Sequence, residues 1–177
     1  MDSWLFGLIH GLAGHSPTID RLMVGTATDL FKAIGIMTLI AGMANRQVGR
    51  PLVLRAAFSA LLALGVAYLI QNLFPVPRPF VAHPDLVTPL VAFRTDPSFP
   101  SAFVAMAAGA AGTFLWARGR FSYWLLAVAV LLGFAEVYVG VNYSFDVFAA
   151  LVIGLGIAYG VHRTNTPLDD WFQRRMI

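Results

Sequence analysis

The chain has 177 residues, 58% of them hydrophobic, carries a formal net charge of +3 and contains no cysteine. A soluble domain of this length has roughly 45–50% apolar residues, so the composition indicates an all-α integral membrane protein with a single domain. The absence of cysteine excludes disulfides and thiolate chemistry, and the dispersal of the arginines over several loops argues against a nucleic-acid partner.

Apolar segments follow one another along the chain. The first, residues 3–13, is too short to span a bilayer and contains Trp4 and His10, so we expect a short helix at the membrane surface. Later segments approach the ~20 residues that cross the hydrocarbon. They predict five membrane spans in a helical bundle, at 22–44, 52–73, 99–117, 121–140 and 145–161, followed by a polar tail at 162–177.

Two of these spans carry local signals. In the first span, Asp29 and Lys32 are three residues apart on one helical face, and we expect an ion pair that faces the neighbouring helices. In the third, Ser101 follows Pro100 and can cap the start of a helix. The many small residues after Ser101 predict close packing between helices.

The charges of the loops predict the orientation. The segments 45–55, 118–120 and 162–177 carry three, two and three arginines, and with five spans they all lie on one side. The positive-inside rule places that side in the cytoplasm. The opposite, outer side then holds the longest predicted loop, 75–98, together with Arg78, Ser101 and the turn between the last two spans.

Short motifs in a fixed order give the chain a resemblance to a known family. They are PRPFVAH at 77–83, PSFPS at 97–101 and GFAEVYVGVNYSFDV at 133–147. With them the chain resembles the type 2 phosphatidic acid phosphatase superfamily, and most closely its small bacterial branch, the bacitracin-resistance type of undecaprenyl-diphosphatase. The resemblance covers nearly the whole chain and implies that family's helical bundle in a bacterial inner membrane, with the site on the outer side.

The family's signatures are incomplete in this chain. Arg-Pro of the first is present, but its lysine position is Gln71. The second, Pro-Ser-Gly/Asp-His, has Phe103 where the resemblance implies a general-acid histidine. The third, Ser-Arg, five residues, His, three residues, Asp, has Glu136 in place of the phosphate-binding arginine and Asn142 in place of the nucleophilic histidine. The residues retained are Arg78, Ser101 and Asp146.

These replacements bear directly on the chemistry. Family members form a phospho-histidine, which requires one imidazole as nucleophile and another as proton donor. Asn142 cannot attack phosphorus usefully, and Phe103 cannot donate a proton. Glu136 places a carboxylate where a cation would stabilise the equatorial phosphate oxygens. We therefore expect no intact catalytic set, no cofactor and no metal.

Three hypotheses about function follow. The first is a pseudoenzyme that binds a membrane lipid, such as an isoprenyl lipid, or a partner protein through Arg78, Ser101, Glu136, Asn142, Asp146 and His83. The second is a lipid phosphatase with altered chemistry, in which the acid, base or metal-binding groups are Glu136, Asp146, Asp85, Asp96 or His83. The third is a transporter or an accessory, structural subunit of a larger membrane complex. A partner protein would be another membrane protein or a second copy of this chain. We further expect Glu136 to form a salt bridge with Arg78 and thereby close the old site.

Overall fold

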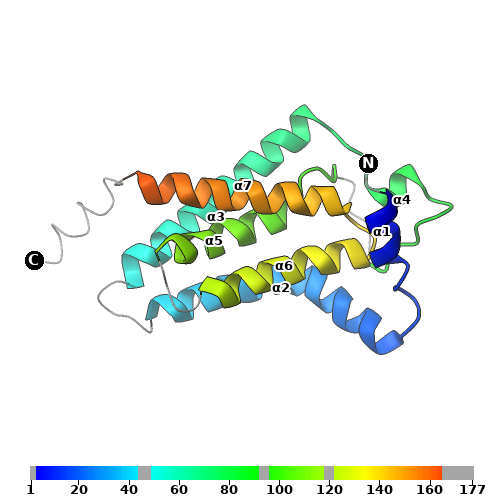
Figure 1. Ribbon diagram of the computed structural model, residues 1–177, viewed down its shortest axis with the longest axis horizontal. Coiled ribbons are helices and arrows are strands. Elements are labelled where there is room, and N and C mark those ends of the chain that lie inside the picture. The colour runs from blue at the N-terminus through cyan, green and yellow to red at the C-terminus, as the bar shows by residue number, and fades with distance from the viewer. Residues whose placement is uncertain (1–2, 44–48, 92–95, 118–121, 165–177) are drawn as a thin grey trace, which may run out of the picture.

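The computed structural model describes residues 3–43, 49–91, 96–117 and 122–164, and every element in these ranges is a helix (Figure 1). This confirms the all-α prediction. In chain order the helices are α1 (Ser3–His10), α2 (Pro17–Met43), α3 (Gly49–Leu73), α4 (Pro79–Ala82), α5 (Ala102–Trp116), α6 (Ser122–Tyr138) and α7 (Ser144–Arg163). The short helix α4 lies inside the predicted 75–98 loop, where the sequence indicated no helix. The predicted tail from 165 onward lies outside the described residues.

Helix α5 is the centre of the bundle, in contact with α2, α3, α6 and α7. Its sequence is dominated by alanine and glycine, and nearly all of it is buried. Small residues let neighbouring backbones approach closely, which replaces the hydrophobic driving force that is missing between helices in lipid. A Cβ added at Gly154 of α7 would collide with the carbonyl oxygen of Ala105 and lie 2.6 Å from Ala108 Cβ.

We expect Gly154→Ala to destabilise the bundle by about 1–3 kcal/mol, because the added methyl group forces α5 and α7 apart. The matched control is Gly156→Ala on the same helix, whose added Cβ would meet nothing within 4 Å. That change should leave stability the same or raise it slightly, since alanine is the better helix former. Thermal unfolding of both variants in one detergent measures the difference, and equal midpoints would contradict the packing described here.

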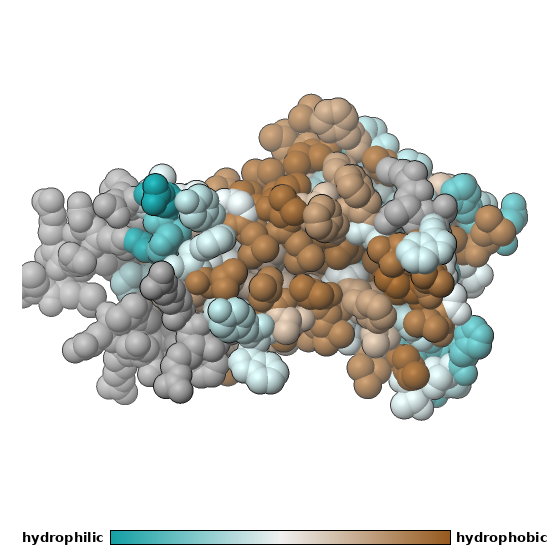
Figure 2. All heavy atoms as spheres, viewed as in Figure 1, coloured by the Kyte–Doolittle hydropathy of each residue, from teal (hydrophilic) through white to brown (hydrophobic). Residues whose placement is uncertain are grey.

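Two helices are long and apolar enough to cross a membrane, 51–73 within α3 and α7 itself. Helix α2 becomes a third if its two segments, which are bent by 61° at a break, count as one span. Helices α5 and α6 are apolar but shorter, with 15 and 17 residues. Figure 2 shows a hydrophobic band across the middle of the molecule with hydrophilic residues towards both ends. The chain is thus a membrane protein of helical type, and the five spans remain a prediction.

The N-terminal helix α1 packs against the end of α6. Phe6 is buried, and Nδ1 of His10 lies 2.9 Å from the carbonyl oxygen of Tyr138. The Tyr138 hydroxyl donates in turn to Asp20 at 2.8 Å. The opposite face of α1 exposes Trp4, Leu5 and Leu8. One face therefore holds the helix on the protein, and the other is the apolar face that a surface helix presents to a membrane.

The ion pair predicted in α2 forms, with Lys32 Nζ 2.5 Å from Asp29 Oδ1. Its predicted direction is wrong, because the two side chains are 63% and 62% exposed and do not face neighbouring helices. The reason is the register of α2, whose buried side carries Ile34 and Thr38 towards α3 and α5. Spacing along one helix fixed which two side chains meet, whereas tertiary packing decided which way they point.

Candidate functional site

The residues retained from the family signatures, and those that replace the lost ones, come together at one end of the bundle. Arg78 immediately precedes α4, Ser101 caps α5, Glu136 lies in the last turn of α6, Asn142 lies in the α6–α7 turn, and Asp146 lies in the first turn of α7. All five are buried, with at most 4% of the residue exposed. The site is therefore assembled from three stretches that are far apart in sequence, at 78, at 101 and at 136–146.

Arg78 is held by four hydrogen bonds to protein acceptors. Its Nε donates to the Asp96 carbonyl at 2.9 Å and Nη2 to Asp96 Oδ2 at 3.0 Å. Its Nη1 donates to the Val141 carbonyl at 2.9 Å and to Asn142 Oδ1 at 3.0 Å. A guanidinium has five N–H donors, so four of them are already engaged within the protein. A phosphate could reach Arg78 fully only by displacing these acceptors.

Ser101 connects the start of α5 to Glu136. Its hydroxyl accepts from the Val104 N–H at 3.3 Å, as the predicted cap requires, and donates to Glu136 Oε2 at 2.6 Å. The positive end of the α5 dipole favours an anion at this point. The Ser101 hydroxyl links the Glu136 carboxylate to the N-terminal end of α5. A side chain of the protein thus supplies the anion at this helix end.

Asn142 and Asp146 hold the turn between α6 and α7. The Asn142 side-chain amide donates to the Ser98 carbonyl at 2.8 Å while its oxygen accepts from Arg78. Asp146 Oδ2 accepts from the Tyr143 N–H at 2.8 Å and caps α7. Asn142 thus bridges two loops in a way that satisfies both ends of its amide, and Asp146 acts on the backbone of its own helix.

The predicted salt bridge between Arg78 and Glu136 is wrong for this structure. Both residues are described, and no ion pair joins them; Arg78 pairs with Asp96, whose side chain is 35% exposed. Asp96, five residues before Ser101, accepts from the guanidinium through its carbonyl and its carboxylate, whereas the Glu136 carboxylate accepts from the Ser101 hydroxyl. The sequence offered Asp96 only as one of several loop carboxylates, with no spacing signal that linked it to Arg78.

Other residues singled out in the sequence make different contacts. His83 and Asp85 are exposed, and His83 ends α4. Phe103 is half-buried and packs against the apolar core around α5. Gln71, at the family's lysine position, is buried and donates to the Pro100 carbonyl at 2.9 Å. That contact supports the turn before α5 and was missed from the sequence.

The chemistry available at the cluster follows from these side chains. Among the described residues no histidine is buried, and no group of three His, Cys, Asp or Glu residues could hold a metal ion. A buried imidazole for nucleophilic attack is therefore absent from the described part of the site. The described part of the cluster offers the Arg78 guanidinium with its acceptors, the carboxylates of Glu136 and Asp146, the Ser101 hydroxyl and the Asn142 amide.

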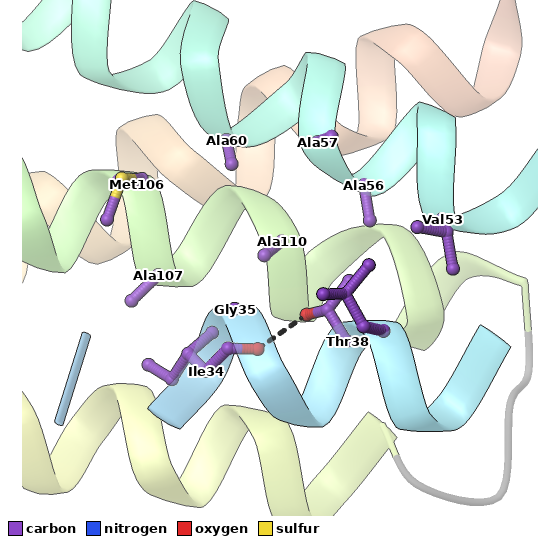
Figure 3. A pocket seen from close by; sticks show the side chains of 11 residues that line it. Ile34, Gly35, Thr38, Val53, Ala56, Ala57, Ala60, Met106, Ala107 and Ala110 are labelled. Atoms are coloured by element: carbon purple, nitrogen blue, oxygen red, sulfur yellow. Dashed lines mark hydrogen bonds between the residues drawn. The ribbon is translucent and has the colours of Figure 1, made fainter. Parts of the chain in front are cut away.

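A cavity of about 280 Å³ lies deeper in the bundle, between α2, α3 and α5. Its lining is apolar, and Figure 3 shows Ala57, Ala60, Met106 and Ala110 projecting into it, with the Thr38 hydroxyl turned back onto the Ile34 carbonyl of its own helix. Met106 is five residues after Ser101 on α5, about one and a half helical turns. The cavity thus lies about one and a half turns along α5 from the polar cluster.

Comparisons with known proteins agree with the fold. The family model of the PAP2 superfamily matches residues 52–168. Undecaprenyl-diphosphatase BcrC of Bacillus subtilis is 30% identical over 159 residues, covering 90% of this chain and 81% of that protein. Putative undecaprenyl-diphosphatase YbjG of Escherichia coli is 28% identical over 152 residues, covering 85% of this chain and 76% of that protein.

Two solved structures share the architecture. LpxE of Aquifex aeolicus superposes with a TM-score of 0.70 at 23% identity, covering 89% of this chain and 92% of the other. A PAP2-type phosphatidylglycerolphosphate phosphatase of Bacillus subtilis gives a TM-score of 0.59 at 19% identity, covering 98% and 86%. At this level of identity the two structures establish the fold alone.

Proposed function

The chain belongs to the PAP2 superfamily, and from that premise we propose that it is a catalytically inactive member that binds a membrane lipid. The observation that carries the proposal is the state of Arg78, whose guanidinium donates to Asp96, Val141 and Asn142. A phosphate that binds an arginine bidentately takes two parallel N–H donors, and here Nε, Nη1 and Nη2 all donate to protein acceptors. The Asn142 side-chain oxygen accepts one of these hydrogen bonds, at the position where the family resemblance implies a histidine nucleophile.

The carboxylate of Glu136 supports the same proposal. It lies at the N-terminal end of α5, a position that favours an anion, and it accepts from Ser101 at 2.6 Å. A diphosphate brought to this place would be repelled by the carboxylate and would have to displace it from its hydroxyl partner. In this proposal the Glu136 carboxylate occupies the place of the substrate's anionic group.

We propose the apolar cavity between α2, α3 and α5 as the binding site of the lipid's hydrocarbon chain. Its lining offers small side chains and almost no polar group, which fits a hydrocarbon chain and not a headgroup. We propose an isoprenyl chain, because the relatives with the matched sequence are named as undecaprenyl-diphosphatases. Lipids that co-purify with the protein, identified by mass spectrometry, should include it, and Ala60→Phe, which enlarges a lining side chain, should reduce its amount.

Inactivity is tested directly. Purified protein should release no phosphate from undecaprenyl diphosphate or phosphatidic acid above the background of buffer and detergent alone, because the described residues of the site include no imidazole nucleophile. The Bacillus subtilis relative, assayed in the same detergent, is the positive control. Turnover by the wild type that survives Arg78→Gln would overturn the proposal in favour of an enzyme with altered chemistry.

We propose that the protein lies in the bacterial inner membrane with five spans, its site outside and its C-terminal tail in the cytoplasm, as the arginine asymmetry predicts. The chain has no cysteine, so single cysteines at Gly49, Asp85 and Gly119 report sidedness without background. An impermeant thiol reagent should label the cysteine at 85 from outside and the other two only after the membrane is opened. Labelling of 49 and 119 in intact cells would reverse the orientation.

A further inference from the structure

The central helix α5 is covered by its neighbours along most of its length. Between Ala102 and Phe114 every residue is buried except Phe103 and Met106. These two residues are three apart, so they lie on the same face of the helix, one above the other. Met106 also lines the apolar cavity between α2, α3 and α5. The face of α5 that can be reached from outside is therefore the one that looks between α2 and α3.

Phe103 lies between this cavity and the polar cluster. It packs against a core cluster that includes Ile34 and Ala110, and both of these residues line the cavity as well. Along the axis of α5, Phe103 is about 3 Å beyond Ser101 and about 4.5 Å before Met106. A hydrocarbon chain that runs from the cavity towards the Ser101 end of the helix would therefore pass the phenyl ring.

The two helices that flank this face of α5 diverge towards the polar cluster. Figure 1 shows α2 and α3 close together at one end of the bundle and separated at the end that carries α1 and α4. Helix α2 contributes to this with a bend of 61° between Pro17–Leu30 and Lys32–Ile40. On their outer sides Ile36 of α2 is 58% exposed and Leu61 of α3 is 66% exposed. Apolar side chains exposed on membrane helices face hydrocarbon, so lipid chains surround this part of the protein.

We propose that Phe103 is a specificity-determining residue, which admits a lipid with one hydrocarbon chain and excludes a lipid with two chains side by side. The inference rests on the proposed function of lipid binding. The cavity of about 280 Å³ is just below the ≈ 300–1,000 Å³ of pockets that enclose a small-molecule ligand, so it holds only part of a long chain. The remainder has to leave along the accessible face of α5, beside the phenyl ring.

The phenyl ring sets the width of this path because its neighbours on the same face of α5 either are small or can move. Ala107 and Ala110 carry a single methyl group each, and Met106 has three rotatable side-chain bonds with which it adapts to a ligand. An aromatic ring is rigid and has only two side-chain torsions. Replacing the ring by a methyl group would therefore widen the path more than any other single truncation on this face.

A competition between two neutral lipids tests the role of Phe103. Geranylgeraniol has one isoprenyl chain and dioleoylglycerol has two acyl chains, and each has one hydroxyl, so charge does not decide between them. Purified full-length protein in mixed micelles receives equal amounts of both, and the lipid retained after gel filtration is measured by mass spectrometry. The wild type should retain geranylgeraniol in about tenfold excess, the discrimination that the shape of an apolar pocket can supply.

Phe103→Ala should bring the two lipids towards equal amounts, because the wider path then accepts the second chain. Phe103→Leu keeps an apolar side chain of similar reach in the core and is tolerated better by the fold; it should move the ratio part of the way. The matched control is Phe134→Ala on α6, whose ring is 37% exposed and belongs to another surface of the bundle. That variant should keep the wild-type ratio.

Two failures can be told apart in this experiment. A wild type that retains neither lipid above the amount carried through the column by empty micelles would overturn the proposed lipid binding, and the role of Phe103 with it. A wild type that retains geranylgeraniol while Phe103→Ala and Phe103→Leu keep its ratio would leave lipid binding standing and refute the role of Phe103. An equal change of the ratio in Phe134→Ala would refute it too.

Discussion

Phe103→His, Glu136→Arg and Asn142→His together should give this protein phosphatase activity on isoprenyl diphosphate, on the order of 10²-fold or more above the wild-type background. The triple change returns the proton donor, the phosphate-binding cation and the nucleophile in one step. General acid catalysis alone contributes about 10²–10⁴ in rate, and loss of a nucleophile that works with its partners costs on the order of 10⁶. Recovery stays partial because Ala135, which stands where the resemblance places the serine of the third signature, is not changed.

The structure also predicts how the triple variant behaves without substrate. Glu136 is buried and hydrogen-bonded to Ser101, so an arginine there adds a second buried cation to the cluster that already holds Arg78. Without an anion the two cations repel each other, and the variant should unfold at a lower temperature than the wild type. Inorganic phosphate should raise its unfolding temperature by binding the folded state and leave the wild type unchanged.

The matched control keeps Asn142 and changes only Phe103→His and Glu136→Arg. It carries the same added cation and should respond to phosphate in the same way, yet it lacks the nucleophile and should not turn over. Phosphate release is measured for the wild type, the triple variant and the double variant, and only the triple variant should exceed the background. If the triple variant binds phosphate but stays at the background rate, the fold positions these residues differently from the family's active members.

Arg78→Gln should lower the free energy of unfolding by about 3–5 kcal/mol, the cost of removing one partner from a buried ionic network. The change leaves the Val141 carbonyl and the Asn142 side-chain oxygen without their donor at a site where Asn142 is 3% exposed. Asp96→Asn should cost only about 1 kcal/mol or less, because Asp96 is partly exposed and its backbone carbonyl still accepts from Arg78.

Unfolding in one detergent, followed for both variants, measures these differences. Arg21→Gln on the exposed start of α2 is the matched control for removing an arginine from the surface, and it should change stability little. A loss from Arg78→Gln no larger than that from Arg21→Gln would mean that water reaches the site and that the guanidinium is not committed to its protein acceptors.

Some features of this protein follow from the sequence itself, because they depend on neighbours along the chain. Apolar length predicts the long helices, Ser101 after Pro100 predicts the cap that accepts from Val104, and the spacing of Asp29 and Lys32 predicts their ion pair. Motif order identified the family, which the matches confirm. In each case the interacting groups lie within a few residues or the signal is compositional.

The contacts that give the site its character were decided by tertiary structure. Arg78 donates to Asp96, which is 18 residues away, and to Asn142, which is 64 away, while Glu136 accepts from Ser101 across 35 residues. No periodicity relates such positions, so the pairing of Arg78 with Glu136 was a reasonable expectation from charge that proved wrong. The packing of α5 among its neighbours determines which loop lies near which helix end. This arrangement pairs Arg78 with Asp96 and places the Glu136 carboxylate at the Ser101 hydroxyl.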